Sequence, residues 1–450
     1  MPVPENRADL VEPSEALTAA ELTEAWPLLD LDERVRGFRC LPHAEAADFF
    51  LALDARDQST VLAALSSHEQ RLWLRQLPPD DLADLLQQVE PERRAQLFAL
   101  LDEAGKKEVS ALLAFAEDDA GGLMNTRFAR VRPDMTADEA IRYLRRQARD
   151  RQGVETIYYA YVLDAGQRLL GVVSFRELFA APLDKLVREI MHTEVVSVPS
   201  EMDQEAVARV MQQNDVLAVP VLDAERRMQG IITHDDIQDV VQEEATEDIQ
   251  KIGGTEALEK PYLQTRFAEM IRKRAGWLSV LFLGETLTAS AMGYYEHELG
   301  KALVLTLFIP LIMSSGGNSG SQASTLVIRA MALGEVKLRD WWIVARRELA
   351  TGAMLGTILA VIGILRICAW QAMFHSYGEH YLLIACAVAL ALVGVATWGT
   401  LAGSMLPFIL RRFHLDPASA SAPFVATLVD VSGLVIYFTA ASAILAGTLL

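Results

Sequence analysis

The 450-residue chain has little cysteine, no basic start and no phosphate-binding loop. Its three cysteines, Cys40, Cys368 and Cys386, are scattered, which predicts neither a disulfide framework nor a zinc site. The first residues, MPVPENRADLVEP, have no apolar core behind a basic start, so we expect no signal peptide and a cytosolic N-terminal half. No nucleophile–base constellation and no G-x-x-x-x-G-K-[ST] loop occurs, so we do not expect an enzyme.

The net charge of −19 lies entirely in the first 275 residues. From Gly276 onward there are nine acids and nine bases, which leaves 51 of the 60 acids and 32 of the 41 bases in the first part. Such an excess of acid repels nucleic acid and attracts cations, although it often serves only solubility. The length predicts two or more domains.

A repeat with a period of twelve residues begins at Asp54. The units are DARDQSTVLAAL, SSHEQRLWLRQL, PPDDLADLLQQV, EPERRAQLFALL and DEAGKKEVSALL. Each unit opens with helix-starting chemistry, such as Ser66 or Pro79, and closes on leucines that no single unit can bury. The pattern predicts an all-α helical-repeat domain over residues 1–123, with a loose helix or flexible lead to about residue 40.

A second, longer repeat occupies residues 124–248. MNTRFARVRPDMTADEAIRYL aligns with MHTEVVSVPSEMDQEAVARVM, and further on Asp164 aligns with Asp223 and Gly171 with Gly230. Each copy reads as an extended segment, an amphipathic helix, two strands and a helix. The pair resembles a tandem CBS module of α+β fold, and related modules often bind adenine nucleotides.

Acids are crowded at the end of the second copy, before the basic residues of 266–274. Spacings of three and four place subsets on one helical face, where like charges repel. The run is either a solvated face or a divalent-ion sensor that fixes a linking helix over residues 249–275. The six acids are Asp236, Asp239, Glu243, Glu244, Glu247 and Asp248.

Residues 276–450 contain five apolar stretches, which predict a five-helix transmembrane domain. They are roughly Trp277–Tyr294, Ala302–Ile328, Leu349–Trp370, Tyr381–Leu410 and Ala422–Leu450. Basic residues gather before the first stretch and after the second and fourth, whereas the opposite loops contain only Lys301. This asymmetry predicts a cytosolic N-terminus and an external C-terminus.

Two stretches carry the chemistry expected in the membrane. Asp430 is a single acid inside an apolar run, which indicates a site for a cation or, alternatively, a buried pair with a base. In the second stretch, Pro310 and the glycines of GGNSGSQAST predict either an irregular, oxygen-lined passage or close helix packing. Pro407 and Pro423 are expected to interrupt the fourth and fifth stretches. Few carboxylates and many neutral oxygens suit Mg²⁺, which keeps much of its water. Electrostatics alone would equally admit Ca²⁺, Mn²⁺ or Co²⁺, since selection among them depends on the width of the pore.

The order of these parts, with GGNSGSQAST, ALGEVKLRDW and PFVATLVDVSGLVIYF, resembles the MgtE family of bacterial Mg²⁺ channels. The resemblance implies a homodimer with a pore on its two-fold axis, in the bacterial inner (plasma) membrane. It implies that cytosolic Mg²⁺ closes the pore by binding acids of the N-terminal, CBS and linking ("plug") elements. The chain would thus serve magnesium uptake and homeostasis.

By position, the resemblance makes Asp430 the ion-selecting acid and Asp416 a second acid at the cytosolic side of the pore. The sensor acids that it implies are Asp118, Asp203, Asp215, Asp236, Asp239, Glu244, Glu247 and Asp248. For a bound ATP, it implies Tyr159, Arg176 and Glu177. The sequence departs from some relatives at Ala422 and Ser321, where they carry Asn, and Glu285 has no place in the pattern.

Two other functions stay open. One is a gradient-coupled divalent cation carrier or exporter, for which flux depends on a proton or Na⁺ gradient. The other is a nucleotide-sensing membrane receptor or scaffold, which tolerates loss of Asp430.

Overall fold

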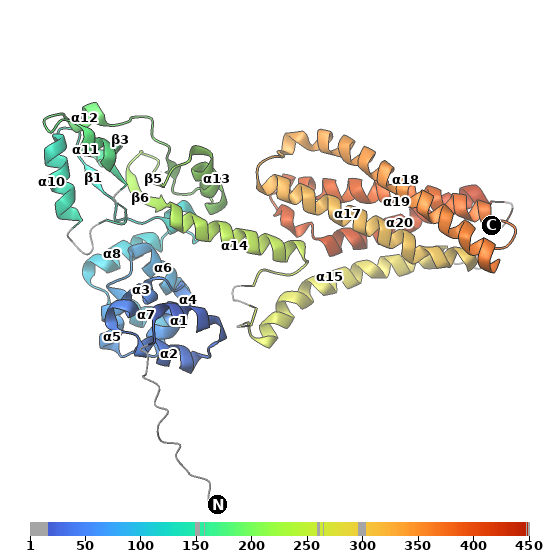
Figure 1. Ribbon diagram of the computed structural model, residues 1–450, viewed down its shortest axis with the longest axis horizontal. Helices are drawn as coiled ribbons and strands as arrows, with labels where there is room; N and C mark the ends of the chain where they lie inside the picture. The colour runs from blue at the N-terminus through green and yellow to red at the C-terminus, as the bar shows by residue number, and fades with distance from the viewer. Residues whose placement is uncertain are drawn as a thin grey trace, which may run out of the picture. The chain divides into compact units, whose positions relative to one another are not determined.

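The computed structural model describes residues 17–148, 154–156, 158–258, 262–263, 265–295, 303–446 and 448. The chain divides into two compact units, Met1–Gln242 and Glu243–Leu450 (Figure 1). The first part of the expected lead, up to residue 16, and Lys301 lie outside the described residues.

The first unit begins with short helices packed around one apolar core. They are α1 (Ala19–Ala25), η1 (Trp26–Leu28), α2 (Leu31–Cys40), α3 (His43–Leu51), α4 (Ala55–Ala63), α5 (Ser67–Leu74), α6 (Pro79–Gln87), α7 (Pro91–Leu100) and α8 (Glu103–Leu112).

The twelve-residue repeat is confirmed in α4 to α8. Their N-cap residues are Asp54, Ser66, Pro78, Glu90 and Asp102, one every twelve residues. The leucines at the end of each unit, such as Leu62, Leu74 and Leu86, are buried. The repeat helices therefore bury their apolar faces against one another, with contacts such as α4 on α6 and α6 on α8.

The expectation of a loose lead to residue 40 is wrong from α1 onward. Leu22, Trp26 and Phe38 are buried in the same core as the repeat helices. Arg34 and Trp26 both bind the buried Asp57 of α4, with 2.7 Å from Arg34 Nη1 to Asp57 Oδ1. These apolar and charged contacts are long-range, so the local lack of periodicity did not reveal them.

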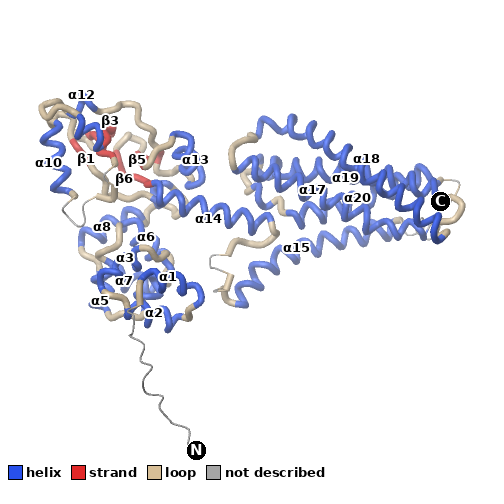
Figure 2. The backbone as a smooth tube through the Cα atoms, in the orientation of Figure 1, coloured by secondary structure: helices blue, strands red, loops and turns tan. Residues whose placement is uncertain are grey.

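Two three-stranded sheets with the same topology follow (Figure 2). In each, the first strand pairs in parallel with the second, and the second pairs antiparallel with the third. The elements are α9 (Ala120–Leu123), β1 (Arg130–Val131), α10 (Ala137–Gln147), β2 (Tyr159–Leu163), β3 (Leu169–Ser174), α11 (Phe175–Ala180), α12 (Val187–Ile190), β4 (Val198–Pro199), α13 (Gln204–Asn214), β5 (Ala218–Leu222) and β6 (Met228–Thr233).

The aligned residues Asp164 and Asp223 have the same structural role in the two copies. Asp164 accepts from the backbone N–H of Gly166 and Arg168 at 2.8 and 2.9 Å, and Asp223 accepts from those of Glu225 and Arg227 at 3.0 and 2.7 Å. Each carboxylate thus fixes the turn between its two strands. The sequence repeat is a true structural repeat.

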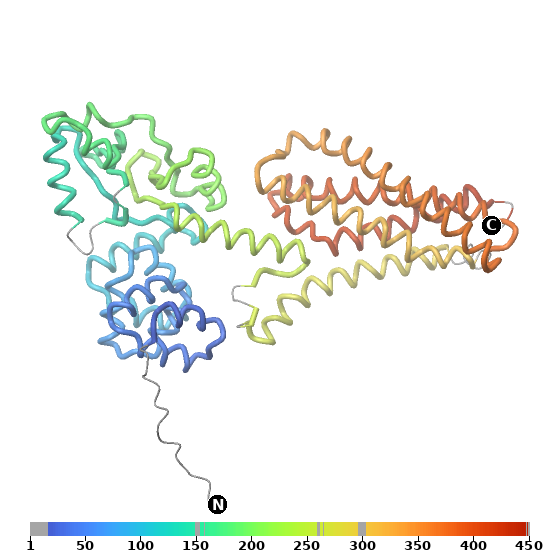
Figure 3. The backbone as a smooth tube through the Cα atoms, in the orientation of Figure 1, coloured from blue at the N-terminus to red at the C-terminus, as the bar shows by residue number. Residues whose placement is uncertain are grey.

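The second unit consists of long helices, which Figure 3 traces by colour from yellow to red. The boundary between the units falls inside α14 (His234–Ile252). The elements that follow are α15 (Phe267–Tyr294), η2 (Leu303–Phe308), α17 (Ile309–Ala332), η3 (Leu338–Asp340), α18 (Trp341–Phe374), α19 (Tyr381–Arg412), η4 (Pro417–Ser419) and α20 (Ala422–Leu445). Helix α19 packs against α17, α18 and α20, and α15 lies along α20.

Within the described residues, four helical segments are long and apolar enough to cross a membrane. They are Leu303–Ala332, Leu338–Phe374, Tyr381–Arg412 and Ala422–Leu445. Helix α15, the expected first span, is not among them, although its 28 residues are long enough.

Of the two alternatives for the second stretch, the irregular passage is wrong, because α17 is a continuous helix, and close helix packing is confirmed. Pro310 lies in its first turn, where no backbone donor is lost. A Cβ on Gly320 would lie 2.8 Å from the carbonyl oxygen of Gly399, so the glycines serve close packing on α19. Pro407 likewise lies inside continuous α19, and Pro423 lies in the first turn of α20.

Candidate ion-binding sites

The acid of the final helix faces a second acid. Asp430, on α20, is hydrogen-bonded through its carboxyl group to the carboxyl group of Glu285, on α15. The helices approach closely here, since a Cβ on Gly284 would lie 2.8 Å from Thr427 Cγ2. Among the residues that the structure describes, neither acid forms an ion pair with a basic side chain. Glu285, unplaced by sequence, therefore belongs beside Asp430.

Packing along the whole length of the two helices sets this pair. Trp277 and Phe424 have ring centroids 6.0 Å apart, and Tyr295 stacks on Phe438 at 4.6 Å. The contacts advance along both helices together, so α15 and α20 run in the same direction. Glu285 and Asp430 lie between these aromatic contacts, and their approach follows from the register.

The second predicted pore acid, Asp416, binds a lysine of α14. Lys251 Nζ lies 2.6 Å from Asp416 Oδ2, and it also pairs with Glu247 one turn earlier on its own helix. The other oxygen of Asp416 accepts from the backbone N–H of Ala418 at 2.8 Å. Burial alone would lower the pKa of Lys251, but its hydrogen bonds to Asp416 and Glu247 raise that pKa above its ordinary value.

Acids from three segments of the first unit gather around the start of α14. Asp80 is buried in the first turn of α6, and its Oδ1 accepts from Asn125 Nδ2 at 3.0 Å. The same amide donates to Glu155 Oε2 at 2.8 Å. Asp236 accepts from the backbone N–H of Thr233 at 3.0 Å, which caps α14. Asn125 thus holds two acids, while its backbone pairs with Ile231.

The electrostatics of this group differ from those of a solvated face. Burial raises the pKa of Asp81 to about 7, with the charges of Asp236 and Glu155 adding to the effect. Burial and the charge of Asp81 also raise the pKa of Asp80 well above its ordinary value. Burial raises the pKa of Asp236 despite its hydrogen bonds to Thr233. Ionisation of these carboxyl groups therefore brings like charges together between α6 and α14.

Other predicted sensor acids have local structural roles. Asp203 caps α13 by accepting from Glu205 N and Ala206 N at 3.0 and 3.3 Å. Asp215 ends α13 in the left-handed region, with φ at 50°. The backbone oxygen of Asp118 accepts from Gln204 N at 2.8 Å. Asp239 adds to the negative field at Asp81, whereas Glu244 and Asp248 lie farther along α14, in the second unit.

Sequence reasoning missed Asp80, Asp81, Glu155 and Lys251. The segment PPDD was interpreted as the start of a repeat helix. Its two adjacent acids were the one signal that could have marked it as part of a candidate ion site. Within the described ranges, no three His, Cys, Asp or Glu side chains are grouped so that they could hold a metal ion. The metal-ligating roles therefore stay predictions.

The residues expected to bind ATP lie at the end of the first sheet. Tyr159 begins β2, opposite Ser174, while Arg176 is exposed on α11. Glu177 accepts from Ser174 N and Oγ at 2.9 and 2.7 Å and binds His192 Nε2 at 2.5 Å. Ser174 and Glu177 thus form a capping box at the start of α11, which accounts for the position of Glu177 without a nucleotide.

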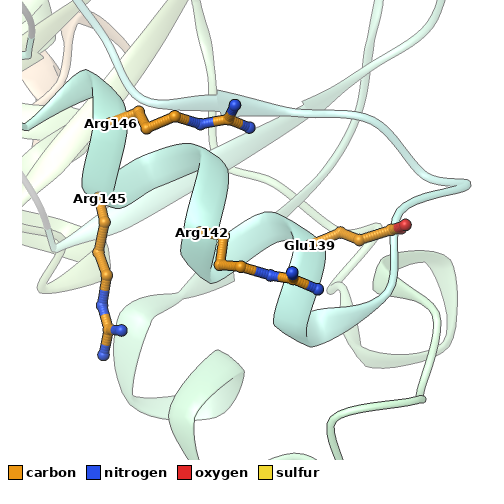
Figure 4. A pocket seen from close by; sticks show the side chains of 4 residues that line it. All are labelled: Glu139, Arg142, Arg145 and Arg146. Atoms are coloured by element: carbon orange, nitrogen blue, oxygen red, sulfur yellow. The ribbon is translucent and has the colours of Figure 1, made fainter.

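Three arginines of α10 line a separate pocket with Glu139 (Figure 4). They are Arg142, Arg145 and Arg146, and Arg142 also pairs with Asp138. Figure 4 shows the side chains of Arg145 and Arg146 extending from the helix in different directions. None of the residues expected to bind ATP is among the described residues that line this pocket.

Comparison with known proteins connects these features. The MgtE intracellular N domain matches residues 17–118, the CBS domain matches residues 120–184 and 187–243, and the MgtE divalent cation transporter family matches residues 309–440. The magnesium transporter MgtE of Thermus thermophilus is 40% identical over 346 residues, or 77% of this chain and 74% of that protein. The chain belongs to the MgtE family of magnesium transporters. MgtE of Enterococcus faecalis is 34% identical over 342 residues, 76% of this chain and 72% of that protein.

Among solved structures, the cytosolic domain of the Mg²⁺ channel MgtE in complex with ATP has 41% identity and a TM-score of 0.47. The alignment covers 50% of this chain and 91% of that one. Membership of the MgtE family, together with the four apolar helices, identifies a membrane protein with a helical N-terminal domain and a tandem CBS module.

Proposed function

We propose that this MgtE protein is a Mg²⁺-selective channel for magnesium uptake, closed by Mg²⁺ on its cytosolic side. The observation that carries the proposal is the carboxyl pair of Asp430 and Glu285 among apolar helices. A negative charge there is costly unless a cation or water compensates it. Mg²⁺ binds through one or two carboxylates while it keeps several waters, so this pair suits it.

A polar face of α17 supports an ion path beside the pair. Ser314, Asn318 and Gln322 are spaced by four residues, so they share one face of an otherwise apolar helix. Ser314 and Asn318 are exposed in the single chain, and Gln322 is exposed as well. Neutral oxygens of this kind can replace part of the water around a cation. In a homodimer, two copies of this face would line one pore on the two-fold axis.

We propose α15 as a fifth membrane span. Its large apolar side chains Leu278, Phe282 and Leu287 are 55%, 71% and 59% exposed. Such a surface is stable against lipid and costly against water. Burial of these side chains in lipid would offset the charge of Glu285, which lowers the mean hydropathy of the helix.

The basic loops support an orientation in the bacterial inner membrane with the N-terminus cytosolic and the C-terminus outside. Arg339, before α18, and Arg412, at the end of α19, line one pocket together. Basic ends that meet in this way favour the cytosolic side. Arg366 lies elsewhere, with its Cζ 5.7 Å from the ring centroid of Phe308 and 5.3 Å from that of Trp370.

The cytosolic acids are proposed as the sensor. Mg²⁺ between α6 and α14 would relieve the repulsion among Asp80, Asp81 and Asp236 and would bias the linking helix. Asp239, Glu244, Glu247 and Asp248 would extend this response along α14. ATP binding at Tyr159, Arg176 and Glu177 is a further proposal, which the nucleotide complex of the related cytosolic domain motivates.

The test is Mg²⁺ flux into proteoliposomes and current in inside-out patches, with Asp430→Ala against Glu335→Ala. Glu335 is an acid exposed in the loop before α18, and its loss is expected to leave flux intact. Asp430→Ala is expected to abolish flux while the protein remains folded. Robust uptake by that variant would refute the pore assignment, and flux that requires a proton or Na⁺ gradient would favour a carrier.

A further inference from the structure

The end of α14 carries one base between two acids. Lys251 Nζ lies 2.6 Å from Asp416 Oδ2 and also contacts Glu247 Oε1. The three side chains are 28%, 36% and 35% exposed, in the order Lys251, Asp416, Glu247. Charges that are shielded to this degree are screened by salt less than surface charges are. The ammonium group is therefore an effective counter-ion for both carboxylates.

The acids are held in place independently of the lysine. Asp416 caps η4 through Ala418 N, so its carboxylate has a fixed orientation without Lys251. Glu247 lies four residues before Lys251 on the same helix, which keeps its side chain on the same face. Two carboxylates are thus positioned for a cation, and the cation that they hold is a side chain of the chain itself.

Apolar contacts hold this end of α14 as well. Ile252 packs against Ile328, Ala418 and Ala420. Gly254 has φ at +76°, and a Cβ there would lie 3.0 Å from Pro423 Cγ and 3.1 Å from Trp277. Removal of the charge at residue 251 therefore leaves several contacts that keep the helix end beside the start of α20.

The balance of charge favours exchange with a divalent ion. One ammonium group against two carboxylates leaves a net charge of about −1, which still attracts cations. Lysine is a compact charge on a flexible stem, so it can leave without any backbone change. Mg²⁺ carries twice the charge and accepts carboxylate oxygens while it keeps its other waters.

We propose that Lys251 is a positioning residue that acts as a built-in counter-ion, so that cytosolic Mg²⁺ must displace it to bind Glu247 and Asp416. This inference rests on the proposed function, in which these two acids bind the regulatory ion. Lys251 holds the linking helix at the mouth of the membrane domain when Mg²⁺ is low. Its competition sets the Mg²⁺ concentration at which the protein responds.

The experiment compares Lys251→Met, Lys251→Arg and the wild type as full-length protein, titrated with Mg²⁺ alone. The first measurement is hydrogen exchange of the amides around residues 247–256 and 417–420, which needs no ion flow. Its midpoint is the Mg²⁺ concentration that produces half of the change in exchange. The second is the Mg²⁺ concentration that halves the current in inside-out patches. Lys251→Met, which keeps an unbranched apolar stem without the charge, is expected to lower both midpoints roughly fivefold, as the loss of a modest ion pair would.

Three controls make the result specific. Lys251→Arg keeps the charge and is expected to stay near the wild-type midpoint. Arg339→Met removes an exposed base before α18 and is expected to shift neither midpoint. In an Asp416→Asn background, the effect of Lys251→Met is expected to shrink, because the lysine acts through Asp416.

The outcomes separate this inference from the proposed function. An unchanged or higher exchange midpoint in folded Lys251→Met overturns the role of Lys251, whatever the currents are. A fivefold lower exchange midpoint without Mg²⁺ current in any variant supports the role of Lys251 and refutes the channel.

Discussion

Glu285 of α15 and Asp430 of α20 share a hydrogen bond between their carboxyl groups. Each acid comes from a different helix, and no base pairs with either of them among the described residues. Two carboxyl groups at one place make the empty site less favourable in free energy. They also increase the free energy gained when a divalent ion binds. The hydrogen bond needs a proton on one carboxyl group, so the empty pair carries one negative charge. A divalent ion that displaces this proton is balanced by both carboxylates, whereas a monovalent ion is balanced by one.

Glu285→Gln is therefore expected to reduce Mg²⁺ flux severalfold and to weaken the preference for divalent over monovalent cations. The residual flux reflects Asp430, which the variant retains. Ion uptake by proteoliposomes, measured for Mg²⁺ and for Na⁺, tests this, with Glu335→Gln as the matched control. Flux and preference equal to those of the wild type would show that Glu285 has no part in permeation.

The sequence makes single acids conspicuous, whereas it does not show which acids form pairs. Asp430 was evident, because one charge in an apolar run is conspicuous without any tertiary information. Glu285 was noticed but not placed, since only the register of α15 on α20 brings it to Asp430. Lys251 was overlooked for the same reason: its partner Asp416 is 165 residues away.

Local chemistry was also ambiguous wherever one residue serves two purposes. Asp80 follows Pro79, and the sequence indicates correctly that a helix starts there. The burial of Asp80 depends on the contact of α6 with Asn125, which the sequence does not show. The glycines of α17 were compatible with a loosened backbone or with close packing, and only the contact with α19 decides for packing. The repeat of twelve residues succeeded because its caps and leucines recur independently of tertiary contacts.

Asp81 is expected to make the stability of the protein depend on pH when Mg²⁺ is chelated. Its folded-state pKa is raised to about 7, above the ordinary value of 3.8. Its contribution is full below that ordinary value and is lost as the pH rises through about 7. The thermal unfolding temperature of the cytosolic unit in the full chain is thus expected to be higher at about pH 6 than at about pH 8.

The variant Asp81→Asn is expected to remove most of this dependence and to stabilise the chelated protein by about 1–2 kcal/mol at the higher pH. The control is Asp48→Asn, which changes an acid of α3 that lies outside this group. An equal pH dependence in Asp81→Asn and the wild type would count against burial of charge at α6.

Neutralising the acids of α14 together is expected to raise the open probability at millimolar cytosolic Mg²⁺. The change is to Asn or Gln at Asp236, Asp239, Glu244, Glu247 and Asp248. Without these charges Mg²⁺ has little to bind, so it can no longer favour the closed state. Inside-out patches test this, and inhibition by Mg²⁺ that matches the wild type would exclude α14 as the sensor.

Gly403→Ala is expected to destabilise the membrane domain. A Cβ on Gly403, in α19, would lie 2.1 Å from the carbonyl oxygen of Gly320, in α17. That oxygen belongs to a helix backbone and cannot rotate away, so the two helices must separate, at a cost of about 1–3 kcal/mol. Thermal unfolding of the detergent-solubilised protein measures the cost, with Gly293→Ala in α15 as the control.

A Cβ on Gly293 would meet no atom of another described element within 4 Å, so alanine there is expected to be neutral or to stabilise the helix by up to about 1 kcal/mol. Equal unfolding temperatures for Gly403→Ala and Gly293→Ala would mean that the contact between α17 and α19 is looser than these distances require.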